Sequence, residues 1–249
     1  MSLDRTLDDV LRDLGTPERA EQEKRYLKTD LTHYGVPVPA MRRAVKEALA
    51  EFPDLTRVEL LRAVVALWSQ PVYERRSAAV EMLVQRVKLL EAQDLALIER
   101  LLRESKTWAL VDVLSVHIAG PLVTRIPTLN DTLDRWATDE DFWVRRASML
   151  SLLLALRKGG GDFDRFARYA DAMLEEREFF IRKAIGWILR ETGRKRPELV
   201  TKWLLPRAKR ASGLTFREAT RSLPEAQRDK LTGAREKAAA KRDTRARVS

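Results

Sequence analysis

Two side chains of opposite character, an indole and a carboxylate, stand one helical turn apart in the segment TWALVDV, residues 107–113. Trp108 and Asp112 are four positions apart, so in a helix they lie on the same face. An aromatic face beside a carboxylate suits a positively charged sugar or base, through cation–π attraction and charge neutralisation. A salt bridge from Asp112 to an arginine is an equally simple explanation, and the spacing alone leaves both open.

Trp187 is a second aromatic residue that could contact a positively charged sugar or base. It follows Phe180 by one heptad in the segment REFFIRKAIGWILRE. Seven residues make almost two helical turns, so both rings fall on a similar face of one helix. Trp187 therefore either packs in the core or lines a binding surface. A tryptophan within a helix is more often a core residue, and we expect Trp68, Trp136 and Trp203 to be core residues of this sort.

The elements that must position these residues follow an internal repeat. Five related segments each open with an aromatic anchor, and subtraction gives spacings of 35, 35, 37 and 36 residues between anchors. That period is typical of HEAT and armadillo helix-turn-helix units. The anchors are Tyr73, Trp108, Trp143, Phe180 and Phe216. With apolar residues at helical spacing nearly everywhere, the sequence predicts an all-α, HEAT-like helical-repeat solenoid with a concave basic groove.

The repeat also predicts where helices begin and end. Inner helices are expected to begin near residues 72, 107, 142, 179 and 215. Their partners are expected near 56–68, 91–104, 128–137, 162–176 and 195–210, after capping helices over 4–15, 17–29 and 39–51. Glycine and proline predict breaks at 51–53, 120–121, 159–161 and 193. We expect one solenoid domain over 1–224, followed by a basic, disordered tail over 225–249. A capped array needs no partner chain, so a monomer is expected.

The charge of the chain favours a polyanionic partner. Its formal net charge is +10, and phosphate neutralisation by Lys and Arg drives nucleic-acid binding. Residues 226–249 hold eight Lys/Arg and three Asp/Glu, so half of that excess lies in the tail. The cations at equivalent inner-helix positions are Arg75, Arg76, Arg145, Arg146, Arg182, Lys183 and Arg217. This row predicts phosphate contacts with duplex DNA, and salt bridges between neighbouring helices are the competing interpretation.

Several classes of protein are disfavoured by composition. The chain has no cysteine, and its two histidines, His33 and His117, do not by themselves suggest a zinc site. We therefore expect no metal and no other cofactor. No apolar run approaches about 18 residues, and the first 30 residues are too charged for a secretory signal. We expect no membrane association and a cytoplasmic protein of bacterial type, associated with the nucleoid through DNA.

Four segments resemble those of a known family. TWALVDV, FWVRRASML, FFIRKAIGWILRE and the N-terminal YLKTDLTHYGVPVPAMR are similar to diagnostic segments of the AlkD-like DNA alkylation-repair glycosylases, which are HEAT-like repeat proteins. The resemblance covers roughly residues 20 to 220. It implies hydrolysis of the N-glycosidic bond of N3- and N7-alkylated purines in duplex DNA, without a metal or organic cofactor. An alkylated purine already carries positive charge, so it leaves without a general acid.

The resemblance also implies roles for individual residues. Asp112 would be the catalytic carboxylate, which stabilises an oxocarbenium-like sugar and positions water. Trp108 and Trp187 would be aromatic walls beside the lesion nucleotide, and Arg146 a backbone-phosphate contact. Tyr26 would approach the DNA from the N-terminal helices.

One further residue fits the resemblance, and one segment departs from it. Lys28 completes the Tyr-x-Lys pattern that begins at Tyr26 and is a further candidate DNA contact. Beside Trp108, many members of the family have Trp-Trp-Asp before the Val-Asp pair, where this chain has Thr107-Trp108-Ala109.

Two other functions fit the same sequence. A noncatalytic repeat protein could bind damaged or branched DNA with the same arginine row, and replacing Asp112 by Asn separates it from an enzyme. A protein-interaction scaffold could use the same fold. A scaffold would owe most of its DNA binding to the basic tail, so removal of the tail separates it from a groove binder.

Overall fold

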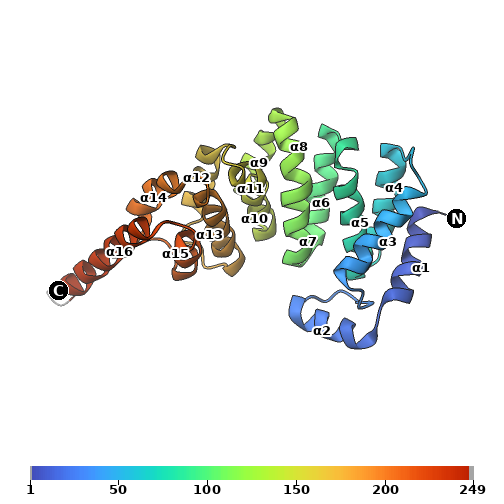
Figure 1. Cartoon of the computed structure of the whole chain (residues 1–249), viewed down its shortest axis with the longest axis horizontal. Helices are drawn as coiled ribbons and strands as arrows, with labels where there is room; N and C mark the ends of the chain where they lie inside the picture. The colour runs from blue at the N-terminus through green and yellow to red at the C-terminus, as the bar shows by residue number, and fades with distance from the viewer. Residues whose placement is uncertain (1, 247–249) are drawn as a thin grey trace. The chain divides into compact units, whose positions relative to one another are not determined.

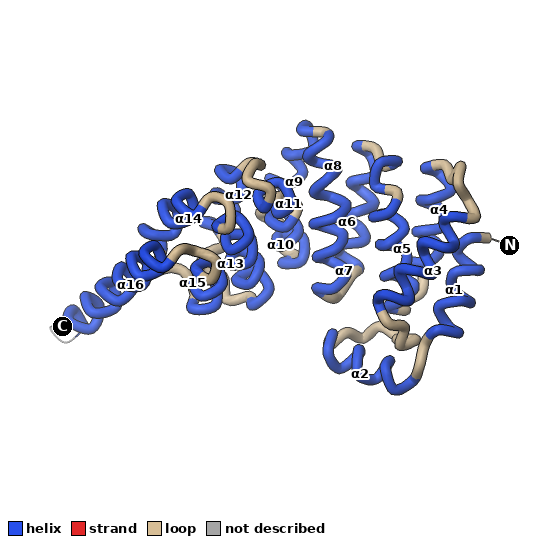
Figure 2. Tube along the Cα trace, in the orientation of Figure 1, coloured by secondary structure: helices blue, strands red, loops and turns tan. Residues whose placement is uncertain are grey.

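The computed structural model describes residues 2–246, and side chains over residues 2–237. The described residues form helices joined by short turns (Figure 1), and Figure 2 shows no strand among them. Thr32 and Val72 pair in a single isolated parallel bridge. The contacts divide the described residues into two compact units, with the boundary between Ile126 and Pro127. No helix in the described part is both long and apolar enough to cross a membrane.

The N-terminal unit begins with three helices and continues as helical pairs. Its α-helices are α1 (Leu3–Leu14), α2 (Pro17–Leu27), α3 (Val38–Ala50), α4 (Arg57–Trp68), α5 (Tyr73–Gln85), α6 (Leu95–Glu104), α7 (Trp108–Val113) and α8 (Gly120–Arg125). Short 3-10 turns at Val87–Leu89 and Ala92–Asp94 precede α6, and a π-helical segment, Leu114–Ala119, joins α7 to α8.

The C-terminal unit repeats the helical pairs. It contains α9 (Asn130–Trp136), α10 (Phe142–Leu150), α11 (Leu153–Arg157), α12 (Phe163–Ala172), α13 (Phe179–Gly193), α14 (Pro197–Leu204), α15 (Gly213–Thr220) and α16 (Glu225–Ala246), with 3-10 turns at Pro127–Leu129 and Leu205–Arg207. The predicted starts of the inner helices are confirmed, because α5, α7, α10, α13 and α15 begin within two residues of them.

Polar residues fix where several of these helices begin. Thr56 and Glu59 form a capping box at α4, in which each side chain bonds the backbone N–H of the other residue. Asp141 accepts a hydrogen bond from the Trp143 N–H at the start of α10. Such caps satisfy backbone donors that have no partner inside the helix. The repeat anchors therefore start their helices at fixed places in each unit.

One predicted break was wrong. The chain stays helical from Trp108 through Gly120 and Pro121 to Arg125. Proline inside an α-helix clashes with the carbonyl four residues earlier and offers no N–H. Here the turn before Pro121 is a wider π-helix, Leu114–Ala119, which removes the requirement for that four-residue spacing. The helix passes the proline by widening and does not end.

The predicted tail forms a helix over most of its length. Within the tail predicted to be disordered, 225–249, residues 225–246 form α16, and residues 247–249 lie outside the described residues. Alanine, glutamate, lysine and arginine dominate α16, and all favour helix. Its first half also packs on the unit, since Leu231 is fully buried and Arg235 donates to the carbonyls of Ala208 and Ala211. A single solenoid domain over 1–224 stays a prediction.

Buried apolar and aromatic side chains fill both units. In the N-terminal unit α5 packs on α3, α4 and α7, and in the C-terminal unit α13 packs on α10, α11 and α15. The expected core tryptophans are confirmed, because Trp68, Trp136 and Trp203 are all buried. These contacts fix the inner helices α5, α7, α10 and α13, which carry most of the candidate site residues.

Helices α13 and α15 approach closely at Gly186. A Cβ there would lie 2.6 Å from the Glu218 Cβ and 3.1 Å from the Thr215 carbonyl oxygen. We expect Gly186→Ala to lower the free energy of unfolding by about 1–3 kcal/mol, because overpacking forces the two helices apart. Gly233→Ala in α16 is the matched control, since nothing lies within 4 Å of its Cβ position. Urea unfolding of both variants measures this, and equal stability of the two would contradict the close approach.

Candidate nucleic-acid interface

Helix α7 carries Trp108 and Asp112 on one face, as their spacing predicts. Thr107 precedes the helix in an extended conformation, and its hydroxyl oxygen lies 3.5 Å from the Ala109 N–H nitrogen as the helix cap. Both Trp108 and Asp112 are half-buried. Thr107 therefore caps the start of α7. Many members of the AlkD-like family, which this segment resembles, have Trp at this position.

The π-helical segment directly after α7 is a feature that sequence reasoning missed. It begins two residues after Asp112, and the Ser115 hydroxyl donates to the Val111 carbonyl at 2.6 Å. Insertions of this kind occur often at functional sites, where they change the direction of side chains along a helix. Pro121 inside a helical pattern was the one signal in the sequence that could have indicated it.

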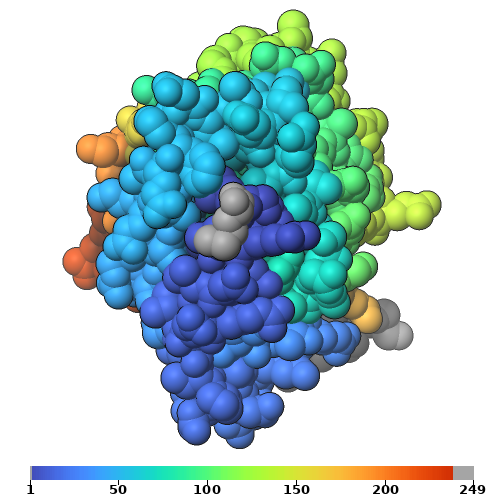
Figure 3. Space-filling model, turned by 90° about the vertical axis from the view of Figure 1, so that its right-hand side faces the viewer, coloured from blue at the N-terminus to red at the C-terminus, as the bar shows by residue number. Residues whose placement is uncertain are grey.

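Tyr26 lies against Trp108. Its side chain is 71% exposed, and the two ring centroids are 5.9 Å apart with their planes at 82°, an edge-to-face arrangement. In Figure 1, α2 lies below α3 and α7 and runs across the direction of the other helices of this unit. Figure 3 shows the same segment as the lower rim of the N-terminal face. The structure thus presents two aromatic rings, one of them largely open to solvent, beside the helix that carries Asp112.

Backbone pairing fixes the chain that follows α2. Lys28 ends the helix in the left-handed conformation (φ 50°) and is exposed. Thr32 then donates its N–H to the Pro71 carbonyl and accepts from the Tyr73 N–H, both at 2.9 Å. The position of Tyr26 therefore depends on contacts with the start of α5.

Trp187 and Arg146 belong to the C-terminal unit. Trp187 is half-buried on α13. Arg146 on α10 is 2% exposed; its guanidinium donates to the Phe180 carbonyl and lies 5.7 Å from the Phe180 ring centroid. The phosphate contact at Arg146 and the aromatic wall at Trp187 stay predictions, and so does the concave basic groove.

Three cations of the predicted row are held by carboxylates. Arg75 binds Asp8 at 2.6 Å, Arg145 binds Glu176 with two nitrogens at 3.1 and 2.8 Å, and Lys183 binds Glu218 at 2.7 Å. Arg145 also donates to the carbonyls of Asp139 and Glu140. The salt-bridge interpretation of the row therefore applies to these three residues.

The remaining cations differ in how much they are engaged. Arg76 donates to the Glu104 carbonyl at 2.7 Å and stacks on the Trp68 ring at 4.8 Å, and burial lowers its pKa despite the opposing charge of Glu104. Arg182 donates to the Glu176 carbonyl at 2.6 Å. Arg217 is exposed, and the described residues offer it no ion pair. Arg217 in this row and Lys28 outside it are thus the most exposed of the candidate cations.

Several positively charged side chains surround the Glu218 carboxylate at the contact between α13 and α15. Burial raises the pKa of its carboxyl group, but the hydrogen bond from Lys183 and the charges of Lys183, Arg190 and Arg221 outweigh burial and leave the pKa below its usual value. Glu218 is therefore ionised at neutral pH and neutralises part of the surrounding charge. Lys183 would have to exchange this partner for a phosphate in order to bind DNA.

Comparisons with known proteins agree with this fold. A family model described as DNA alkylation repair enzyme matches residues 7–223. A predicted DNA alkylation repair enzyme from Enterococcus faecalis superposes with a TM-score of 0.76 at 24% identity, covering 85% of this chain and 97% of that chain. AlkD2 from Streptococcus mutans gives 0.61 at 17% identity, covering 89% and 99%. No curated protein matches the chain. The fold is a HEAT-like helical-repeat fold, and the chain belongs to the DNA alkylation repair enzyme family.

Proposed function

We propose that this protein is a DNA glycosylase that hydrolyses the N-glycosidic bond of cationic N3- and N7-alkylated purines in duplex DNA, the first step of base excision repair. The observation that supports this most is the contact between Tyr26 and Trp108 on the helix that carries Asp112. Membership of a DNA alkylation repair family supports the same substrate class. Neither a metal nor an organic cofactor enters the proposed reaction.

The chemistry needs one carboxylate. As the bond between C1′ and N9 breaks, its electron pair leaves with the purine and cancels the positive charge of the alkylated ring. The sugar becomes oxocarbenium-like, and the negative charge of Asp112 stabilises it. Water adds to C1′ and releases its proton to the Asp112 carboxylate, which passes it to solvent. The products are the free alkylated base and an abasic sugar.

The aromatic rings would bind the positively charged lesion nucleotide. Trp108 and Trp187 would lie beside the lesion nucleotide, where indole faces attract a cation. The exposed face of Tyr26 is free to contact the duplex next to Trp108. Because selection would rest on charge and on the weak glycosidic bond, the proposal requires no fitted pocket for an extruded base.

DNA binding is proposed to use exposed cations first, with further cations of the inner helices contributing where the duplex reaches them. Lys28 in the N-terminal unit and Arg217 in the C-terminal unit are exposed, and Arg146 and Arg182 would contribute where the backbone of the duplex reaches them. Phosphate contacts of this kind give affinity without reading sequence. A monomer acting on the duplex is sufficient for this arrangement.

Replacement of Asp112 tests the reaction. We expect purified wild-type protein to release 7-methylguanine and 3-methyladenine from alkylated duplex DNA. We expect Asp112→Asn to release neither base while binding DNA at least as tightly, because it removes a negative charge next to the duplex. Asp54→Asn, at an exposed turn between α3 and α4, makes the same change of charge and should leave release intact. Tight binding without release by the wild type would instead identify a noncatalytic DNA-binding protein.

Truncation of α16 tests the interface against a scaffold function. The cut belongs after Lys237, because Leu231 and Arg235 pack on the C-terminal unit. Residues 238–249 hold four Lys/Arg and one Asp, a net +3. We expect the truncated protein to keep salt-sensitive duplex binding, with the slope of log K against log salt reduced by about 0.9 for each phosphate that the removed residues neutralised. A fall of affinity to nearly zero would contradict the proposed interface and favour a scaffold.

A further inference from the structure

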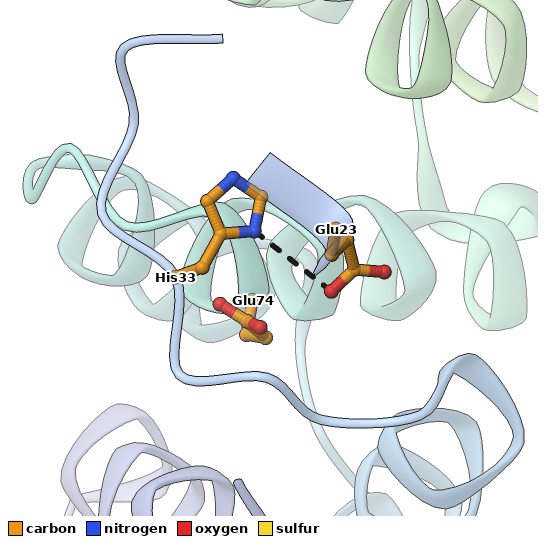
Figure 4. Close-up of side chains that lie close together, drawn as sticks. All are labelled: Glu23, His33 and Glu74. Carbon is orange, nitrogen blue, oxygen red and sulfur yellow. Dashed lines mark ion pairs between the residues drawn. The ribbon is translucent and has the colours of Figure 1, made fainter. Parts of the chain in front are cut away.

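Three potential metal ligands from separate parts of the N-terminal unit lie close together. They are Glu23 on α2, His33 in the segment after α2, and Glu74 on α5 (Figure 4). One ligand atom from each residue lies within 4.8 Å of the other two. In the figure, the Nδ1 edge of the imidazole faces the Glu23 carboxylate.

The His33 imidazole is buried without a hydrogen bond. Its side chain is 1% exposed, and neither Nδ1 nor Nε2 has a hydrogen-bond partner among the described residues. The ring stacks on Tyr73, with centroids 4.9 Å apart and planes at 23°, which fixes its orientation. Buried polar atoms are rarely left unsatisfied, because each costs about 1–3 kcal/mol. The imidazole therefore offers a buried ring nitrogen, Nδ1, that faces a carboxylate and that no described donor or acceptor satisfies.

The Glu23 oxygen that faces His33 also lacks a hydrogen bond. Its Oε2 atom is buried without a hydrogen bond and lies 3.8 Å from His33 Nδ1. That separation is too long for a hydrogen bond. It is also shorter than the roughly 4.2 Å that a nitrogen and an oxygen can span when each lies about 2.1 Å from one zinc ion. Arg19 lies 3.7 Å from the other oxygen of Glu23, Oε1, so Oε2 remains available to a ligand.

Glu74 supplies a third, fixed carboxylate. It is 1% exposed, and its Oε1 accepts the N–H groups of Gly35 and Val36 at 2.6 and 3.2 Å. Its Oε2 accepts the Tyr34 N–H alone, at 2.9 Å. A carboxylate oxygen has two lone pairs, so Oε2 keeps one that no described donor uses. The same three bonds hold the segment that carries His33 against α5.

We propose that Glu23, His33 and Glu74 bind one divalent transition-metal cation, with Zn²⁺ the best match to one imidazole nitrogen and two carboxylate oxygens. Two carboxylates balance the charge of the ion, and water completes its coordination. The three ligand atoms already lie within 4.8 Å of one another, so small side-chain movements would close them around the ion.

Metal binding at this site would affect the position of Tyr26. Glu23 and Tyr26 are three residues apart on α2, so they neighbour each other on the helix surface. A cation that joins Glu23 to His33 and Glu74 would tie α2 to α5 and hold Tyr26 against Trp108. The site is structural and takes no part in the proposed hydrolysis, so metal binding can be tested whether or not the protein is a glycosylase.

The test is Zn²⁺ binding by the full-length protein without an affinity tag. After chelator treatment, native mass spectrometry and calorimetric titration with ZnCl₂ should show one Zn²⁺ per chain. His33→Gln and Glu23→Gln should each weaken binding at least about tenfold. His117→Gln is the matched control, because it removes the other histidine, which is exposed, and should leave binding unchanged. Zn²⁺ should also slow amide exchange across α2 in the wild type and in His117→Gln, and have no such effect in His33→Gln.

Two results would overturn the proposal. Equal Zn²⁺ binding by the wild type, His33→Gln and Glu23→Gln would place the ion elsewhere. Absence of Zn²⁺ binding by the wild type would show that the three side chains do not form a metal site. Glu23→Gln, on the outermost of the three elements, keeps the test decisive if the buried variant His33→Gln fails to fold.

Discussion

The placement of α2 and Tyr26 depends on the buried carboxylate of Glu74. It accepts the N–H groups of Tyr34, Gly35 and Val36, three consecutive donors that would otherwise be left without partners in a turn between helices. A buried charge is tolerated when hydrogen bonds satisfy it, and removing the acceptor would leave all three donors unsatisfied. Because this turn returns the chain from α2 to α3, Glu74 determines where α2 lies. The contact between Tyr26 and Trp108 follows from that position.

Much of the positive charge on the inner helices holds the repeats together. Arg75, Arg145 and Lys183 each pair with a carboxylate on another helix or turn. Arg76 bonds a backbone carbonyl at the end of α6, and Arg182 bonds one in the loop between α12 and α13. Guanidinium groups suit this role because they carry several donors in a fixed plane. A row of arginines at repeat spacing is therefore partly a consequence of the repeat itself. In the proposed function, DNA affinity comes from the exposed cations and from paired cations that exchange their partners for phosphates.

The sequence predicted the helices well because each repeat carries the same local signals. The aromatic anchors, and at α10 and α13 the capping residues before them, act within a few positions. Tyr73, Trp143 and Phe180 therefore indicated where α5, α10 and α13 begin. Features that depend on tertiary contacts or unusual helix geometry were not predictable in this way. Pro121 is accommodated by a π-helical turn, and Glu23, His33 and Glu74 come from three stretches that share no motif. Trp108 and Asp112 were placed on one face by spacing alone, whereas the approach of Tyr26 required the fold.

In the proposed reaction, one carboxylate on α7 performs the chemistry and no general acid protonates the leaving base. The most direct test compares single-turnover release of 7-methylguanine and of hypoxanthine from otherwise identical duplexes. A cationic purine leaves without a proton, whereas a neutral purine needs one before its glycosidic bond breaks readily. We predict release of 7-methylguanine with no detectable release of hypoxanthine. Release of hypoxanthine at a comparable rate would show that a general acid takes part and would contradict the proposed role of Asp112.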